Sequence, residues 1–270
     1  MTKRDNPYIG PRPFERQDQS VFFGRRNETS QLLSLISAHK ALLVYSQSGA
    51  GKTSLINASL IPLLETEGFK VFSPARVLYA SFKDISLSDV SNVYVFSALS
   101  GWLEPKRALS AITRSTFAEF LQCPAGDSEP PRVLMFDQFE ESFTSQPARW
   151  RDRSGFFEQV ADALRLDPVL RTVFVMREDY IASLDPYVSR LPEKLRTRFR
   201  LERLGDKAAL DAVVGPLQGT SRHYGKGVAE KLVQELQMTY AQDEKGEYKP
   251  IVGEFIEPVQ PADHLRTSLG

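Results

Sequence analysis

The sequence has little cysteine, no excess of charge of either sign and no long apolar run. Its 270 residues include a single cysteine, Cys123, which excludes an internal disulfide and a thiolate zinc cluster and fits a reducing compartment. Lys plus Arg and Asp plus Glu both number 34, so no overall field favours nucleic acid or an anionic membrane. No segment is long and apolar enough to span a bilayer, and the N-terminus has no apolar signal core. We therefore expect a cytoplasmic globular protein, and we expect neither a membrane nor nucleic acid as a partner.

The most informative stretch that is present runs from Leu42 to Leu55 and reads LLVYSQSGAGKTSL. An apolar run, then a glycine-rich turn, then a helical pattern predicts a buried strand, a phosphate-binding loop (P-loop) and the start of a helix. In such a loop, backbone N–H groups and the positive end of the helix surround a di- or triphosphate with donors. The residues expected to bind nucleotide here are Ser48, Gly49, Ala50, Gly51, Lys52, Thr53 and Ser54.

Two side chains of this P-loop have distinct expected roles. Lys52 reaches the β- and γ-phosphates, and the hydroxyl of Thr53 binds Mg²⁺. The pattern G-x-x-x-x-G-K-[ST] asks for glycine where this chain has Ser46, but serine also adopts the extended conformation that leaves a strand. We therefore expect a small distortion and not an inactive site. A chance Gly-Lys-Thr turn is the alternative, and the strand before it and the helix after it argue against that alternative.

A second stretch, from Arg132 to Phe143, reads RVLMFDQFEESF. The four apolar residues before Asp137 predict a central parallel strand that delivers this carboxylate to the carboxyl edge of a sheet, where ligands bind. Downstream of a P-loop, Asp137 is predicted to be the Walker B acid, which holds Mg²⁺ through water. Glu140 or Glu141, one short turn later, is the predicted catalytic group that orients the attacking water. The alternatives are a helix N-cap for Asp137 and a solvated first helical turn for the two glutamates.

A third strand, predicted from Thr172 to Met176, ends at Arg177. An arginine at the end of a sheet strand beside the P-loop and Walker B strands is placed to sense a γ-phosphate, so Arg177 is also a predicted catalytic residue. An ion pair with Glu178 or Asp179 is an equally good interpretation.

The segment LRTRFRLERL, residues 195 to 204, alternates arginines with other residues and predicts a strand with a basic face. A solvated edge is one interpretation. An arginine offered to the nucleotide of a neighbouring copy is another, and it implies a homo-oligomer formed through this domain. Nucleic-acid binding is less favoured because the net charge is zero.

The patterns together predict an α/β fold, namely a three-layer P-loop NTPase domain with a parallel sheet, followed by a partial helical subdomain. Helices are expected at residues 88–103, 116–122, 154–166, 206–214 and 226–239. Three prolines and a glycine exclude regular structure at residues 5–14, where aromatic side chains would hold an arm on the surface. The predicted divisions are an N-terminal arm (1–20), the P-loop NTPase domain (21–203), the partial helical subdomain (204–260) and a disordered tail (261–270).

Eight segments, in order along nearly the whole chain, resemble the STAND-class P-loop NTPases and, within them, the bacterial novel STAND group. These segments are NPYIGPRPF, FFGRRNE, SQSGAGKTSL, SNVYVF, VLMFDQFEESFT, VFVMREDY, FRLERL and GEFIEPVQ. The resemblance implies an ATP- or GTP-driven switch in bacterial signalling, conflict or antiviral defence. Members of the family usually carry an effector domain on one side and trigger-sensing repeats on the other.

The resemblance also implies roles for residues that pattern alone leaves open. FFGRRNE is similar to the family's hhGRExE motif, which packs on the nucleotide base, so Gly24 and Arg25 are expected binding residues although Arg26 stands where a glutamate is usual. Gly215-Pro216 resembles the element by which the helical subdomain touches bound nucleotide, which makes Pro216 another expected contact.

We expect a signalling switch that binds ATP or GTP and hydrolyses it slowly with Mg²⁺. A non-hydrolysing scaffold that uses nucleotide structurally is the alternative. A motor ATPase is less favoured, because Gln138 follows Asp137 at the position where fast ATPases place a glutamate. The nucleotide is the expected partner, and the effector and the trigger are not specified by the sequence.

The last expectation concerns the C-terminal end. The resemblance holds through residues 257–260, and the polar segment PADHLRTSLG follows. We expect a truncated switch core whose helical subdomain is its least stable region. Val228, Leu232, Val233 and Leu236 would leave part of an apolar helix face uncovered.

Overall fold

The computed structural model describes residues 7–78, 85–104, 107–123, 129–242, 248–253 and 255–256. The chain forms two compact units, each assembled from separate stretches of sequence. The first unit comprises Met1–Ser30, Ser48–Pro62 and Leu201–Gly270, and the second comprises Gln31–Gln47 and Leu63–Arg200. The expected tail, residues 261–270, and the segment 257–260 lie outside the described residues. In the described part of the chain, no helix is long and apolar enough to cross a membrane.

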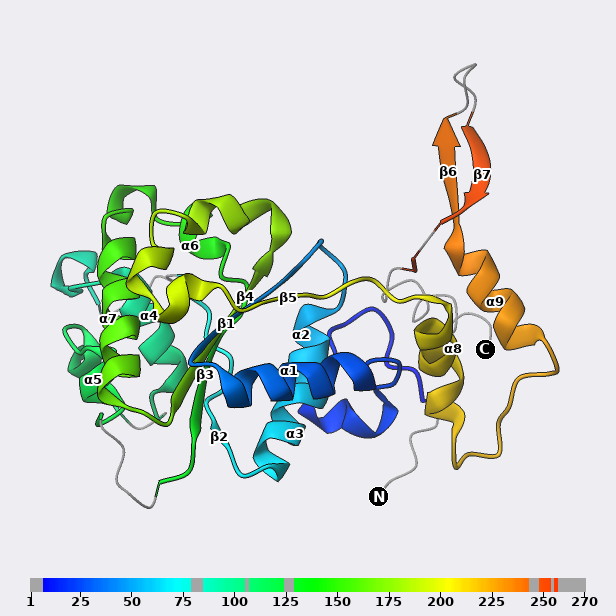
Figure 1. The fold of residues 1–270 in the computed structure, drawn as a ribbon, viewed down its shortest axis with the longest axis horizontal. Coiled ribbons are helices and arrows are strands. Elements are labelled where there is room, and N and C mark those ends of the chain that lie inside the picture. The colour runs from blue at the N-terminus through cyan, green and yellow to red at the C-terminus, as the bar shows by residue number, and fades with distance from the viewer. Residues whose placement is uncertain are drawn as a thin grey trace. The chain divides into compact units, whose positions relative to one another are not determined.

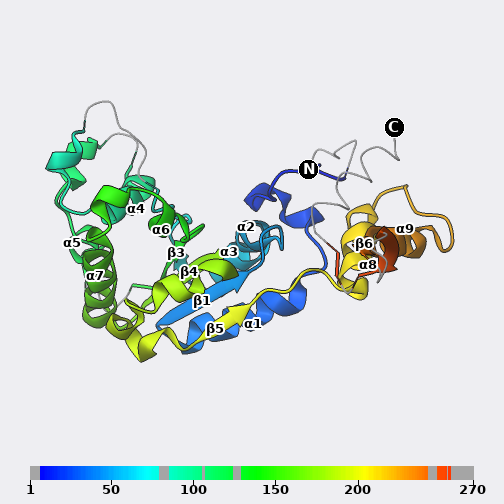
Figure 2. The same ribbon diagram turned by 90° about the horizontal axis from the view of Figure 1, so that it is seen from above.

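The second unit is built around a five-stranded, all-parallel β-sheet (Figures 1 and 2), which confirms the predicted sheet. Its order is β2-β3-β4-β1-β5, so β4 lies between β1 and β3. The predicted apolar runs form the central strands, which are buried on both faces as expected for parallel strands. The strands are β1 (Ala41–Ser46), β2 (Lys70–Val71), β3 (Arg132–Phe136), β4 (Leu170–Arg177) and β5 (Arg198–Arg200).

Helices cover both faces of this sheet, as Figure 1 shows: α4, α5 and α7 lie on one side and α1 lies on the other. This arrangement is the predicted α/β fold of three layers. The helices of this part are α1 (Arg26–Ala38), α4 (Val93–Trp102), α5 (Phe117–Phe120), α6 (Glu141–Thr144) and α7 (Asp152–Leu166). Short 3-10 turns occur at Leu87–Asp89, Leu109–Ile112, Pro147–Arg149, Glu178–Leu184, Val188–Arg190 and Pro192–Leu195.

Aromatic rings fill the layer between the sheet and α4, α5 and α7. Phe136 on β3 is completely buried, and its ring centroid lies 5.1 Å from that of Phe156 and 5.5 Å from that of Phe174. Trp102, Phe117 and Phe139 surround the same ring at 5.8 to 6.2 Å. The inward face predicted for α7 is buried as expected. These aromatic contacts hold in place the sheet whose strand ends carry Ser46, Asp137 and Arg177.

The helix that follows the P-loop continues past Pro62 without ending. It consists of α2 (Lys52–Leu55), a π-helical turn (Ile56–Leu60) and α3 (Ile61–Thr66). In the π turn the N–H of Ile61 donates to the carbonyl of Ile56, five residues back. A proline ring crowds the carbonyl four residues before it and offers no N–H, so a wider turn just ahead of Pro62 accommodates the ring.

The C-terminal part of the first unit contains the two predicted helices. They are α8 (Asp206–Val214), which has the predicted bounds, and α9 (Val228–Gln237), with a short turn at Gly215–Leu217 after α8. A hairpin of β6 (Met238–Gln242) and β7 (Tyr248–Val252) follows α9 directly (Figure 1), where the helix was expected to run to Thr239.

These helices share a small apolar cluster with the N-terminal arm. Val233 and Leu236 of α9 are 5% and 8% exposed, so the expectation that they lack cover is wrong. Tyr8, Leu204 and Val213 belong to the cluster that covers them. Val228 is 51% exposed, which agrees with the expectation that part of the apolar face of α9 is uncovered.

Candidate functional site

The P-loop of the first unit has the backbone shape of an anion-binding loop. Gly49 and Gly51 take left-handed φ values of 79° and 90°, and Gly51 directly precedes α2. Successive N–H groups in such a turn form a concave donor surface, which the helix start reinforces. Ser48 and Gly49 are exposed, Ala50 is buried, and Lys52, Thr53 and Ser54 lie in the first helical turn. These predicted residues are therefore brought together as one loop and helix start.

The FFGRRNE segment packs against the P-loop and against α8. The guanidinium of Arg25 is 5% exposed and donates to the carbonyl of Ala50 at 3.0 Å. Gly24 has a φ of 85°, and a Cβ at this position would lie 2.3 Å from the carbonyl oxygen of Ala208. Only glycine fits there, because both the conformation and the contact exclude a side chain.

Pro216, the other expected contact, lies buried in the turn after α8. Its neighbour Gly215 faces Phe23, whose ring a Cβ would meet at 2.3 Å. The hhGRExE-like segment and the Gly-Pro turn are thus in direct contact, which the sequence pattern did not predict.

The N-terminal arm reaches both the P-loop helix and α8. The backbone N–H of Phe14 donates to the hydroxyl of Ser54 at 3.1 Å, so this predicted site residue also fixes the arm. Tyr8 is buried and its hydroxyl donates to the carbonyl of Val213 at 2.8 Å. The ring of Phe14 meets that of Phe22 edge-on at 5.1 Å. Aromatic side chains therefore hold the described part of the arm, as expected.

In the second unit, three strands present polar residues at the same edge of the sheet. Ser46 ends β1 and pairs in register with Arg177, which ends β4, and Asp137 directly follows β3. Asp137 is 6% exposed, and its N–H donates to the carbonyl of Ala75. The residue that caps α6 is Glu140, so Asp137 is not the N-cap of that helix. Asp137 thus stands at the same edge of the sheet as Ser46 and Arg177, the last residues of β1 and β4.

The two candidate glutamates have different surroundings. Glu140 accepts a hydrogen bond at 3.2 Å from the backbone N–H of Arg177. Glu141 instead forms an ion pair with Arg76, and this contact raises the pKa of the Arg76 guanidinium. Gln138, at a left-handed φ of 52°, makes the sharp turn that brings Glu140 back to the strand ends. Arg76 was not predicted, because no local pattern links residues 65 apart.

Arg177 is paired within its own turn. Its guanidinium donates to the carboxylate of Asp179, with an Nε–Oδ1 distance of 3.2 Å, and lies 5.7 Å from the ring centroid of Tyr180. The Asp179 carboxylate raises the pKa of Arg177. The structure therefore contains the ion pair that was the alternative to phosphate sensing. On β5, which pairs with β1, Arg200 forms an ion pair at 3.1 Å with Glu178, the residue after Arg177.

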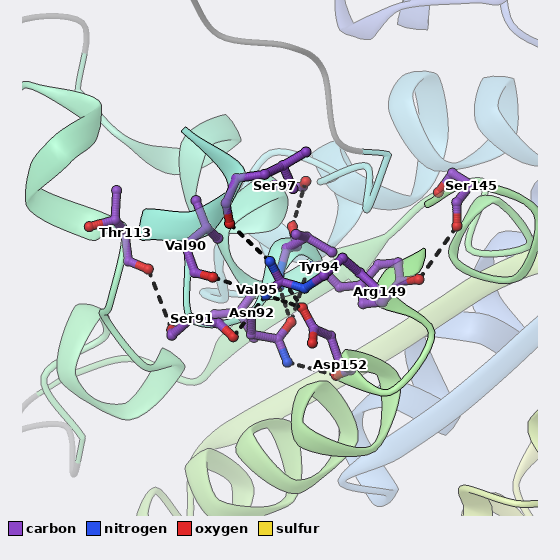
Figure 3. Close-up of polar contacts among 12 residues, drawn as sticks. Val90, Ser91, Asn92, Tyr94, Val95, Ser97, Thr113, Ser145, Arg149 and Asp152 are labelled. Atoms are coloured by element: carbon purple, nitrogen blue, oxygen red, sulfur yellow. Dashed lines mark hydrogen bonds and ion pairs between the residues drawn. The ribbon is translucent and has the colours of Figure 1, made fainter. Parts of the chain in front are cut away.

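The SNVYVF segment forms a polar network at the start of α4 (Figure 3). The side chain of Asn92 accepts from the N–H groups of Tyr94 and Val95, which makes it the N-cap, and it donates to the carbonyl of Asp152. Arg149 pairs with Asp152 at 2.7 Å and also binds carbonyls of the segment before α4. The network joins the beginnings of α4 and α7.

A further arginine links this network to the segment of residues 137–141, here called the acidic turn, which joins β3 to α6. Arg153 of α7 donates to the carbonyls of Ser142 and Phe143 at 2.7 and 3.2 Å. Tyr94 donates to the carbonyl of Ser145 at 3.5 Å. The helix α6, which follows Glu140, is therefore held by side chains from α4 and α7. The sequence predicted α4 and α7 but not their contacts with α6.

Comparison with solved structures finds several that are similar to this chain. A Walker-type ATPase of Pyrococcus abyssi superposes with a TM-score of 0.52 at 15% identity, over 84% of this chain and 66% of that chain. AMPPCP-bound DnaA of Aquifex aeolicus gives 0.46 at 15% identity, over 82% and 59% of the two chains. A DNA replication initiation factor gives 0.48 at 17% identity, over 82% and 60%. The first likeness shows the fold, and this chain spans 66% of that ATPase's length.

At the level of sequence, no curated protein matches the chain. The family model described as Novel STAND NTPase 1 matches residues 7–247, which include the P-loop, the acidic turn and both helices α8 and α9. The chain therefore belongs to the Novel STAND NTPase 1 family of P-loop NTPases.

Proposed function

We propose that this STAND-type NTPase is a signalling switch that binds ATP or GTP and hydrolyses it slowly with Mg²⁺. The observation that carries the proposal is the arrangement of the acidic turn. The residue next to Asp137 is Gln138, which cannot act as a base, and the next acid along the chain is Glu140, whose carboxylate accepts a hydrogen bond from the backbone N–H of Arg177. An acid delivered by a later turn supports slow hydrolysis and a long-lived bound state.

The residues present fit a magnesium nucleotide. Lys52 would supply a positive charge for the β- and γ-phosphates, the hydroxyl of Thr53 would bind Mg²⁺, and Asp137 would hold the ion through water. Within the described ranges, no group of three or more His, Cys, Asp or Glu side chains is arranged to hold a metal. This donor set matches a cation bound by one or two protein oxygens together with phosphates. The resemblance adds Gly24 as a contact for the base and Pro216 as a contact for the bound nucleotide.

We assign the orientation of the attacking water to Glu140. Glu141 is committed to Arg76, so its use in catalysis would require that ion pair to open. Arg177 remains the proposed γ-phosphate sensor. Its ion pair with Asp179 is solvent-exposed, with side chains 42% and 51% accessible, and such pairs exchange partners at little cost.

The test is single-turnover hydrolysis by the purified protein and three variants. Glu140→Gln should abolish hydrolysis and retain nucleotide, whereas the matched variant Glu141→Gln should keep most of the rate. Lys52→Ala should lose Mg-ATP binding in calorimetry, with an unchanged circular dichroism spectrum. Hydrolysis lost only in Glu141→Gln would contradict the assignment of Glu140.

Nucleotide binding and multiple-turnover hydrolysis by the parent protein separate the proposed switch from its alternatives. Tight nucleotide binding with no hydrolysis in the parent protein would favour the non-hydrolysing scaffold. Multiple turnover at about 10 s⁻¹, an ordinary enzyme rate, would instead favour a motor. Identifying the nucleotide released from freshly purified protein distinguishes ATP from GTP.

A further inference from the structure

The guanidinium of Arg25 joins three segments that are far apart in the sequence of the first unit. Its Nη1 donates to Glu28 at 2.6 Å, and its Nη2 donates to the carbonyls of Ala50 at 3.0 Å and Glu202 at 2.8 Å. With 5% of the side chain exposed, these charge-assisted bonds replace water almost completely. The planar fork of arginine reaches all three acceptors at once, which the single ammonium of lysine does not.

The bond to Ala50 sets the direction of the next amide group. The carbonyl of Ala50 and the N–H of Gly51 belong to one planar trans peptide, in which they point in opposite directions. Arg25 holds the carbonyl on the protein side, so the N–H of Gly51 points the other way. Gly51, with a φ of 90°, stands at the start of α2, where the N–H groups of a P-loop bind phosphate.

We propose that Arg25 is a positioning residue for phosphate binding. It fixes the Ala50–Gly51 peptide so that the N–H of Gly51 faces the phosphates, and it does so without touching the nucleotide. The inference rests on the proposed function and changes the role that the family resemblance implies for Arg25, which is packing on the base. The second carbonyl, that of Glu202, ties the same peptide to the segment that leads into α8.

The experiment compares a ligand without a base to a ligand without phosphate. Binding of inorganic tripolyphosphate with Mg²⁺, and of adenosine, is measured by calorimetry for the full chain, for Arg25→Lys and for the control Arg26→Lys. Arg26 is exposed and adjacent, so its variant controls for a change in local charge and side-chain length. Arg25→Lys should weaken tripolyphosphate binding about tenfold, the effect of one lost charge-assisted hydrogen bond, and leave adenosine binding unchanged.

The outcomes separate the inference from the proposed function. If the parent and Arg25→Lys bind tripolyphosphate equally, the inference fails and the proposed function stands. If Arg25→Lys loses adenosine but keeps tripolyphosphate, Arg25 contacts the base and the inference is overturned. If the parent protein binds neither tripolyphosphate nor ATP, the proposed function fails as well.

A measurement on the parent protein covers the case in which Arg25→Lys does not fold. The guanidinium N–H signals of Arg25 should exchange slowly in ¹⁵N NMR, because three acceptors and burial protect them. They should shift when tripolyphosphate is added and not when adenosine is added. A shift with adenosine alone would contradict the positioning role.

Discussion

In the second unit, aromatic rings fill the space beside the sheet, whereas in the first unit the backbone comes into close contact at two glycines. The ring of Phe136 contacts four other aromatic rings, with centroid distances between 5.1 and 5.9 Å. Gly24 and Gly215 instead leave no room for even one added methyl group, against α8 and against the ring of Phe23 respectively. The first unit is also held by hydrogen bonds from Arg25 to the carbonyl of Ala50 and from Tyr8 to the carbonyl of Val213.

The difference shows two ways of specifying a structure. A core of large rings gains its free energy from buried area, which tolerates exchange of one apolar side chain for another of similar volume. Close backbone contact and buried hydrogen bonds depend on individual atoms, so a single methyl or hydroxyl group decides whether they form. We therefore expect the second unit to respond to lost volume and the first unit to respond to added volume.

The largest effect should come from removing the central ring of the second unit. Phe136→Ala deletes a completely buried side chain and should lower the free energy of unfolding by about 3–5 kcal/mol, the usual cost of a Phe→Ala cavity. Urea unfolding followed by circular dichroism measures it. Phe136→Leu, which keeps most of the volume, should cost less than half as much. Equal losses for the two variants would mean that volume does not control this core.

A smaller but more specific effect is expected at Gly24 in the first unit. Gly24→Ala places a Cβ 2.3 Å from the carbonyl of Ala208 and should cost about 3 kcal/mol, because overpacking adds to the strain of a left-handed residue. Gly219→Ala is the matched control, since Gly219 has a φ of 75° and nothing within 4 Å of its Cβ position. It should cost about 1 kcal/mol. If the two substitutions lower the free energy of unfolding equally, the close contact of Gly24 with α8 does not add to the cost of the substitution.

The smallest effect should come from removing a hydroxyl group whose contribution to the free energy of unfolding depends on pH. Tyr8→Phe removes the hydrogen bond to the carbonyl of Val213 and the 3.0 Å contact with the hydroxyl of Tyr224, and it should cost about 1 kcal/mol at neutral pH. Burial raises the pKa of Tyr8 above its ordinary value of 10.0, so the folded state favours the neutral phenol. Its stabilisation is complete below pH 10 and is lost as the pH rises further, because only the unfolded chain ionises readily.

Chemical unfolding at neutral pH and above pH 10 checks this dependence. The parent protein should lose more stability between the two conditions than Tyr8→Phe does. Tyr224, whose pKa burial also raises, remains in both proteins and gives both a residual decline. A decline of the same size in both proteins would show that Tyr8 is not the group responsible.

The elements that local pattern defines were predictable from the sequence. Apolar runs that end in Ser46, Asp137 and Arg177 predicted three of the parallel strands, and β4 indeed lies between the other two. The amphipathic pattern predicted the bounds of α8 and the buried face of α7. These predictions succeeded because a hydrophobic period of two or 3.6 residues determines both the element and its buried side.

Contacts between distant residues were not predictable. The choice between Glu140 and Glu141 depends on Arg76, and the surroundings of Arg25 depend on Glu202, which lies 177 residues away. The hairpin after α9 was missed because a helical pattern does not mark its own end when no glycine or proline follows at once. The roles of the site residues therefore remain predictions for the experiments above.

The interleaved sequence of the two units has a consequence for how the chain folds during synthesis. Every residue of the second unit, from Gln31 to Arg200, leaves the ribosome before Leu201, with which the last part of the first unit begins. The sheet unit can therefore form before α8 and α9 have been synthesised. Closing the first unit joins Tyr8 to Val213, 205 residues later, so contacts of very high sequence separation form last and slowly. The first unit therefore closes only after α8 has been synthesised.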